Sequence, residues 1–344
     1  MTFFVSQSCG FRLTVCSVLP SEGMVRGFIH SPFWASMAFQ LFSDLRHQRN
    51  LRFFFPLIVC TWWVVCHPAY AEESTASGES LWAVHDGQSL TEASLLKTVS
   101  QADIVLLGEI HDNPRHHVLR GQLLSDASMS KRRLIAEQLN TGQKAGDNPD
   151  LLSSLEQAGF DANGWQWPLH EPVFSSARKA GLDVFGGNIT APQTREIFTS
   201  KGSQLPEGLG ALLQKAVLGE DALKQLRREI DEGHCGAMPA SMFNGMLAVQ
   251  RARDASMAAE LLKHLPAVLI AGNGHVWKHL GVPQIIRSNR PELHTVSVLF
   301  VEHAAFTDDA ERIKWLQSFK GIADFVWVTP AQLRPDPCLS LRKK

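Results

Sequence analysis

The chain has 344 residues, of which 44% are hydrophobic, so it can bury the core of one large α/β domain or of two smaller ones. Its formal net charge is -1, which removes the electrostatic case for a nucleic-acid partner.

Residues 1–71 have the organisation of an export signal. Basic residues within 46–52 precede an apolar run over 53–66, and Ala69-Tyr70-Ala71 follows that run. A basic region, a short apolar core and an A-x-A site predict cleavage after Ala71 and an exported protein, periplasmic or associated with the cell envelope. An uncleaved anchor is the alternative, although the apolar run is short for a bilayer span.

Two details refine this prediction. Residues 1–36 lie upstream of a complete signal, so we expect translation to start at Met37 and the earlier residues to be mis-called upstream sequence. A lipid anchor requires a small residue directly before a cysteine, whereas valine precedes both Cys60 and Cys66. The signal therefore does not support a lipid anchor.

The remainder, residues 72–344, shows short apolar runs that alternate with helical segments. This pattern predicts an α/β fold with a mostly parallel central sheet flanked by helices. In chain order, strands are expected at 81–84 (an edge strand), 104–107, 134–136, 182–185, 268–271, 295–301 and 325–328.

Helix boundaries follow from capping residues and prolines. A helix over 90–99 precedes the first core strand, and Asn113 can cap a helix that begins at Pro114 and runs to about Ser125. Another helix is expected to open at Thr190 and Pro192. A short helix after the strand at 268–271 is expected to stop at Gly281 and Pro283.

Residues 191–262 have helical periodicity and no strand signal, and they are far more than a crossover requires. We predict that they form a helical lid over the carboxyl edge of the sheet, within a single domain spanning 72–344. Met238, Met242, Phe243 and Met246 share one helical face in this segment. That stripe either packs on the domain core or faces a flat apolar ligand.

Polar residues appear where two buried apolar runs stop. Gly108–His116 follows the strand at 104–107, and Gly272–His275 follows the run at 267–270. Ligand sites in open α/β sheets gather at the carboxyl ends of the strands. His111 and His275 are therefore expected to meet at one rim.

Two carboxylates accompany these histidines. Glu109 leaves the first core strand close to His111, and Glu137 closes the second inside an apolar segment, where it must be paired or coordinated. A salt bridge from Glu137 to Arg251 or Arg253 is the alternative to a ligand-binding role.

Three further histidines are less clear in role. Of His116 and His117, at least one is expected to be structural, because adjacent helix positions point in different directions. His234, beside Cys235, opens the lid helix in this interpretation and can face the rim. His275 itself has the alternative of a histidine bonded to the backbone at a helix start.

Two histidines with neighbouring carboxylates suit zinc or another divalent transition metal, and also haem iron. The spacing alone does not choose between these. No HExxH, paired CxxC, Walker loop or GxSxG motif is present.

After cleavage, Cys235 and Cys338 would be the remaining cysteines. A disulfide between them is consistent with export, and two buried free thiols are equally open.

The motifs resemble the ChaN-type haem-binding uptake proteins, in a superfamily that also contains Tiki proteases and erythromycin esterase-like enzymes. The resemblance runs in the family's order across about residues 80–290. It is carried by Leu107–Asn113 with His116 and His117, Ala136–Gln138, Gly187–Asn188, His234–Gly236, Ala248–Asp254 with Met257 and Ala258, and Ala271–His275 through Gly281–Pro283.

The resemblance implies an α/β fold with a helical lid, an iron-regulated role as an exported protein or lipoprotein, and haem held at the site between two subunits of a homodimer. Association with the outer membrane belongs to the same expectation. The expected haem-iron or metal ligands are His111 and His275, and the residues expected to support haem binding are Glu109, Glu137, Asn188, Asn273 and His234.

One departure concerns the iron ligand. The resemblance implies a tyrosine ligand in some members, whereas the only tyrosine here is Tyr70, inside the predicted signal. Haem binding by this chain would therefore need a histidine ligand.

The sequence thus predicts an exported haem-binding protein that serves iron or haem uptake, rather than an enzyme. The rival prediction is a metal-dependent hydrolase in which Glu109 or Glu137 activates a metal-bound water. A structural envelope protein with a vestigial site is a third alternative.

Overall fold

The computed structural model describes residues 78–336 and residue 338. The predicted export signal over 1–71 and the start at Met37 lie outside the described residues. Within the described part of the chain, no helix is at once long enough and apolar enough to cross a membrane.

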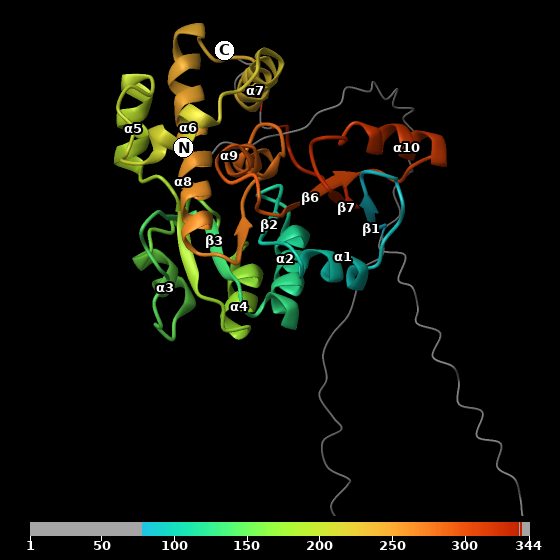
Figure 1. Ribbon diagram of the computed structural model, residues 1–344. Helices are drawn as coiled ribbons and strands as arrows, with labels where there is room; N and C mark the ends of the chain where they lie inside the picture. The colour runs from blue at the N-terminus through green and yellow to red at the C-terminus, as the bar shows by residue number, and fades with distance from the viewer. Residues whose placement is uncertain (1–77, 337, 339–344) are drawn as a thin grey trace, which may run out of the picture. The chain divides into compact units, whose positions relative to one another are not determined.

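Seven strands form one sheet in the order β1-β7-β6-β2-β5-β3-β4 (Figure 1). All neighbouring pairs are parallel except β1 with β7, which confirms the mostly parallel sheet and its edge strand. The strands are β1 (Ser80–Ala83), β2 (Ile104–Leu107), β3 (Arg133–Asn140), β4 (Val184–Asn188), β5 (Ala267–Ile270), β6 (Thr295–His303) and β7 (Phe325–Pro330).

Helices cover both faces of this sheet. One face packs against α1 (Glu92–Val99), α2 (Pro114–Ser125), α3 (Leu151–Gln157) and α4 (Glu171–Lys179). The other packs against α5 (Ala191–Ser200), α6 (Leu209–Lys215), α7 (Glu220–Gly233), α8 (Phe243–Lys263), α9 (Val282–Asn289) and α10 (Asp309–Gln317). Short 3-10 turns occur at Ala127–Met129, Ala240–Met242 and Asn273–Val276.

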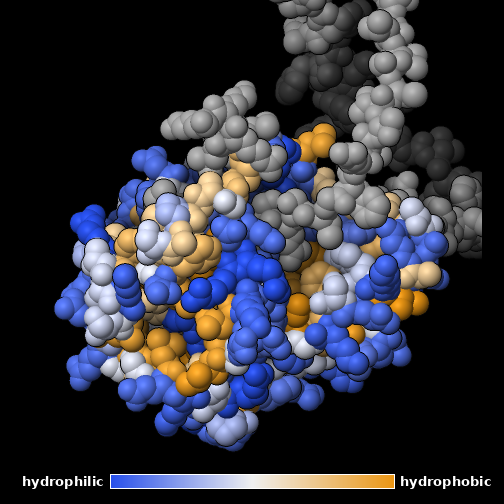
Figure 2. Space-filling model, turned by 90° about the horizontal axis from the view of Figure 1, so that it is seen from above, coloured by the Kyte–Doolittle hydropathy of each residue, from blue (hydrophilic) through white to orange (hydrophobic). Residues whose placement is uncertain are grey.

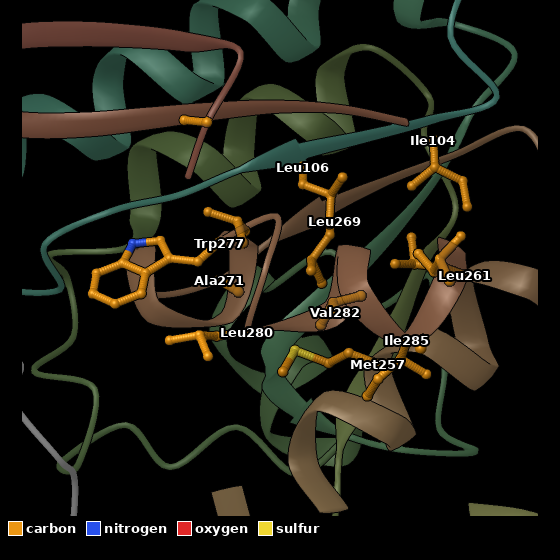
Figure 3. Packing of buried hydrophobic residues seen from close by; sticks show 14 of the residues in the cluster. Ile104, Leu106, Met257, Leu261, Leu269, Ala271, Trp277, Leu280, Val282 and Ile285 are labelled. Carbon is orange, nitrogen blue, oxygen red and sulfur yellow. The ribbon is translucent and has the colours of Figure 1, made fainter. Parts of the chain in front are cut away.

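The central strands are continuous apolar runs because each face of the sheet has its own core. Along β2, Ile104 and Leu106 belong to the cluster under α5–α10, whereas Val105 and Leu107 belong to the cluster under α1–α4. Figure 3 shows Leu106 in the first of these clusters, close to Leu269 of β5 and the α8 and α9 side chains. Burial on both faces explains the absence of polar alternation in these strands.

Two predicted boundaries at the site were wrong. Glu137 does not close a strand, because β3 continues through it to Asn140. Gly281 and Pro283 do not stop a helix but begin one, since Gly281 is the N-cap of α9 and Pro283 lies in its first turn. Proline fits there because a first-turn amide needs no acceptor within the helix.

The segment over 191–262 contains α5, α6, α7 and most of α8, and no strand, as predicted. Its helices also contribute to the core, however. From Val249 onward α8 contributes buried residues to the core and packs against β3, β4 and β5. Because α5, α6 and α7 also place Ile197, Leu209 and Leu226 in this core, the lid over the carboxyl edge stays a prediction.

The predicted methionine stripe is not one helical face, because Met238 precedes the 3-10 turn at Ala240–Met242 and only Phe243 and Met246 lie in α8. It does not pack in the core either. Met238, Phe243 and Met246 are half-buried, and Met242 is 39% exposed. An apolar face is thus left near the start of α8, which favours the ligand-facing interpretation of the stripe.

A disulfide joins Cys235, just after α7, to Cys338 in the C-terminal segment. The same segment is held to the carboxyl ends of the strands by Arg334, which pairs with Asp112 and Glu302. The pairing that the sequence left open is therefore formed, and the C-terminal segment links the sheet rim to α7.

Candidate functional site

Three adjacent strands bring the predicted site residues together. β2 and β3 both pair in parallel with β5, so the carboxyl ends of the three strands share one edge of the sheet. Glu109 and His111 follow β2, His275 follows β5, and Glu137 lies in the second half of β3. The expected meeting of segments far apart in sequence is confirmed.

Glu137 lies between the two histidines. Its Oε2 accepts a hydrogen bond from the backbone amide of Gly272 at 2.7 Å, and its Oε1 is 3.4 Å from Nε2 of His275. The His111 ring lies against Gly272, where a Cβ would stand 2.7 Å from His111 Nε2 and 3.7 Å from Glu137 Oε2. Glycine at 272 is what allows the imidazole to approach this closely.

His275 has a carboxylate at each ring nitrogen. Its Nδ1 is 2.6 Å from Oδ1 of Asp254, and its Nε2 faces Glu137. Burial alone would lower the pKa of His275, but the charges of Glu137 and Asp254, with hydrogen bonds to both, raise it to about 10. A doubly protonated ring donates two hydrogen bonds and has no lone pair for a metal.

The predicted role of His275 as an iron or metal ligand therefore stays a prediction, and its protonation state favours another role. An imidazolium between Asp254 and Glu137 holds both carboxylates in place. Burial raises the pKa of Glu137, yet the charges of His275 and His111 and the Gly272 amide hold it well below its usual range.

The salt-bridge alternative for Glu137 finds only indirect support. Arg251 donates instead to the carbonyls of Leu280 and Ala216 and to the side chain of Gln284. Burial lowers the pKa of Arg253, and the charge of Glu137 opposes that shift, so this arginine lies within electrostatic range of the site.

Glu109 is the centre of a second buried cluster and is only 2% exposed. Its Oε1 is 2.7 Å from Nδ1 of His111 and accepts a hydrogen bond from Gln138 Nε2 at 3.1 Å. Its Oε2 contacts the guanidinium of Arg120 and is 3.1 Å from Nδ1 of His117. The buried carboxylate is thus compensated by a buried cation on one side and faces imidazoles on the other.

His170 completes this cluster from the start of α4. It is 1% exposed, and its Nε2 is 3.6 Å from Glu109 Oε1. Its ring lies 4.1 Å from that of His117, centroid to centroid, and Trp165 packs edge-on against both His170 and His111. Burial lowers the pKa of His170, and the charges of His117 and Arg120 act in the same direction.

Sequence reasoning did not assign a role to His170 or Arg120. His170 lies in an irregular segment just before α4 and shows no periodicity that would place it near β2. Arg120 gave a weak signal, because it is three residues after His117 and so lies on the same side of α2.

His116, in contrast, is structural, as predicted for at least one of the two adjacent histidines. Its Nδ1 accepts a hydrogen bond from the amide of Ile110, and its Nε2 bonds with the hydroxyl of Thr329. Burial lowers the pKa of His116 to about 3, so the ring stays neutral.

The two asparagines differ in position. Asn273 donates from its side chain to the carbonyl of Phe300 and from its amide to the carbonyl of Glu109, so it braces three strand ends. Asn188 ends β4, on the other side of β3 from β5, and its Oδ1 has no hydrogen-bond partner among residues 78–336.

A pocket lies beside this polar rim, between α7, α8 and the segment after β5. His234 lines this pocket. The prediction that it opens a helix was wrong, because His234 is the C-cap of α7, which runs from Glu220 to Gly233. Figure 2, from above, shows apolar side chains exposed between hydrophilic ones on this face. The pocket is lined by Leu226, Glu229, Ile230, Gly233, His234, Met246, Val249, Gln250, Arg253, Gly274, Trp277 and Leu280.

The pocket and the polar rim share a wall. Gly274 and Arg253 line the pocket, and each is the neighbour in sequence of a rim residue, His275 and Asp254. Burial, with the nearby charge of Glu232, raises the pKa of Glu229 to about 7. An apolar pocket with a few polar groups at its edge is typical of a small-molecule site.

The chain matches one family model and resembles solved structures in fold. Residues 95–286 match the family model described as "Haem-binding uptake, Tiki superfamily, ChaN". No curated protein matches the chain. The structure of ChaN from Campylobacter jejuni, described as showing cofacial haem binding, is 18% identical with a TM-score of 0.57, over 74% of this chain and 97% of that one. The type III effector HopBA1 is 14% identical with a TM-score of 0.36, over 69% and 92%.

Proposed function

The chain belongs to the ChaN family of haem-binding uptake proteins in the Tiki superfamily, and we propose its function on that basis. The chain binds haem in the pocket between α7 and α8 and serves iron or haem uptake outside the cytoplasm. The observation that carries the proposal is the chemistry of this pocket, which combines apolar walls with a histidine and an arginine.

The chemistry of the lining residues suits haem, although the pocket, with a volume of about 60 Å³, has to widen to admit it. A porphyrin is flat and largely apolar, and the pocket offers Ile230 and Met246 on its two helices and Trp277 beyond β5. The anionic propionates need a cation, and Arg253 supplies one at the pocket wall. The half-buried methionine stripe extends the apolar surface beyond the pocket.

His234 is the histidine of the site that lines the pocket. Its Nδ1 donates to the carbonyl of Ile230 at 2.6 Å, and this bond favours the tautomer in which Nε2 carries the lone pair. We propose His234 as the iron ligand in place of the missing tyrosine. In this role the protein transports bound haem, and the haem iron takes part in no reaction. Glu109, Glu137, Asn273 and Asn188 would shape the neighbouring rim. Iron ligation by His111 stays a prediction, since His111 does not line the pocket.

Two substitutions test this assignment by haemin titration. His234→Ala should shift the Soret maximum and weaken affinity by at least about tenfold, since a metal ligand is worth at least as much as its outer-sphere support. Met246→Glu should weaken affinity as well, because it places a carboxylate on an apolar wall that meets an anionic ligand.

Ile313→Glu is the matched control, since Ile313 is an apolar residue of α10, is 47% exposed and is not part of the pocket lining. It should leave haemin affinity unchanged. Wild-type affinity and an unshifted spectrum in both His234→Ala and Met246→Glu would place haem elsewhere.

Export is part of the proposal. The disulfide between Cys235 and Cys338 supports it, because such bonds persist mainly in oxidising compartments. If the signal is cleaved after Ala71, mass spectrometry of the protein from the envelope fraction should give an N-terminus at Glu72. An N-terminus before residue 60, or a lipidated cysteine, would contradict it. The homodimer and the outer-membrane association stay predictions of the family resemblance.

The rival function, a metal-dependent hydrolase, remains a second proposal with one observation in its favour. Glu109, His111 and His170 each offer a ligand atom within 4.8 Å of the others. Turnover of peptide or ester substrates that depends on added metal would support it. Haemin binding without such turnover favours the uptake role.

A further inference from the structure

We propose that Glu109, His111 and His170 form a binding site for one divalent transition metal ion, separate from the haem pocket. This ligand set differs from the His111 and His275 pair that the sequence suggests, because it takes its third member from the start of α4.

The geometry of the three groups suits such an ion. Glu109 Oε1 is 2.7 Å from His111 Nδ1 and 3.6 Å from His170 Nε2. In a tetrahedral zinc site with bonds of about 2.0 to 2.2 Å, ligand atoms lie roughly 3.3 Å apart. These two separations bracket that value, and all three ligand atoms lie within 4.8 Å of one another, so an ion requires only local movements of the side chains.

The His170 ring is an independent sign of a missing ligand. It is 1% exposed, and apart from an interaction with the backbone of Trp165 neither ring nitrogen has a hydrogen-bond partner within the described residues. A buried polar group without a partner costs about 1 to 3 kcal/mol, so such groups are rare in native proteins. Since Nε2 is directed toward Glu109, an ion at this point would satisfy it.

The side chains around Glu109 leave one of its carboxylate oxygens directed at the two imidazoles. Arg120 holds Oε2 of Glu109, while Gln138 donates to Oε1, the atom that faces the imidazoles of His111 and His170. Such support behind a ligand is typical of metal sites. Arg120 brings a positive charge close to the ion, but Glu109 and Glu137 bring two negative charges.

Access and metal type follow from the same residues. The His111 side chain is 14% exposed beside Trp165, so the site has an open side toward solvent. Two imidazoles and one carboxylate favour Zn²⁺, Co²⁺ or Fe²⁺ over Mg²⁺ or Ca²⁺. The proposal does not depend on haem, since none of the three ligands lines the pocket.

Equilibrium dialysis of the untagged, chelator-stripped protein against Zn²⁺ tests the site. We expect one ion per chain, and His170→Ala should weaken binding by at least about 100-fold, the upper end of what outer-sphere changes cost. His264→Ala is the matched control, because His264 packs on Phe185 away from the cluster, and it should bind Zn²⁺ as the wild type does. Haemin binding by His170→Ala should be unchanged, which separates this test from the haem proposal.

A crystal structure of the wild-type protein with Zn²⁺ keeps the test decisive if His170→Ala does not fold. An anomalous peak about 2.0 to 2.1 Å from a nitrogen of His170, with His111 and Glu109 as the other ligands, is the expected result. Wild-type affinity in a folded His170→Ala protein, or a peak held by His275 instead, would overturn the proposal.

Discussion

Replacing Arg120 with methionine is expected to destabilise the fold by about 3 to 5 kcal/mol, the cost of breaking a buried ion pair from one side. Arg120 is fully buried, and its guanidinium contacts Glu109 and bonds with Nδ1 of His117 at 2.8 Å. Without it the Glu109 carboxylate stays buried with no adjacent cation. The free energy of unfolding from urea denaturation measures the loss.

A double substitution separates the charge from the packing. Glu109→Gln removes the charge with little change of shape, so Arg120→Met with Glu109→Gln should be more stable than Arg120→Met alone. Two nitrogens of Arg120 have no hydrogen-bond partner among the described residues, so removing both charges forfeits little else. A loss below about 1 kcal/mol in Arg120→Met would show that the pair is not the stabilising element proposed.

The second large effect concerns the disulfide. Cys235 and Cys338 are 103 residues apart in sequence, and chain-entropy models assign a loop of this size roughly 4 to 5 kcal/mol. Cys338→Ser should therefore lower the free energy of unfolding by several kcal/mol, chiefly because the unfolded chain gains freedom.

The control for this prediction is chemical. A dithiol reductant should lower the stability of the wild-type protein toward that of Cys338→Ser and leave the variant unchanged. Non-reducing peptide mapping should recover the two cysteines in one linked fragment. Two separate thiol peptides from unreduced protein would contradict the structure.

The strands around the site could be predicted because their signal is local. The run over 104–107 is apolar on both faces, and the structure places it between two cores. Glu137 interrupts such a run, so the sequence pattern ends the strand there. In the fold, β3 continues, because the Gly272 amide and His275 satisfy the carboxylate within the sheet.

The third member of the metal cluster could not be predicted in this way. His170 approaches Glu109 only because α4 packs against α2, a tertiary contact with no trace in local periodicity. The role of His234 depended in a similar manner on where α7 ends. The pairing of His275 with Asp254 joins α8 to the segment after β5, two elements whose separate patterns say nothing of their contact.

Haemin titration of the purified wild-type protein, followed by absorption spectroscopy, tests the central claim most directly. Binding in the pocket predicts a shifted Soret band that saturates at a fixed ratio of haemin to chain, with a ligand field that changes in His234→Ala. A spectrum that remains that of free haemin, or that rises without saturation, would contradict the assignment of this protein as a haem binder.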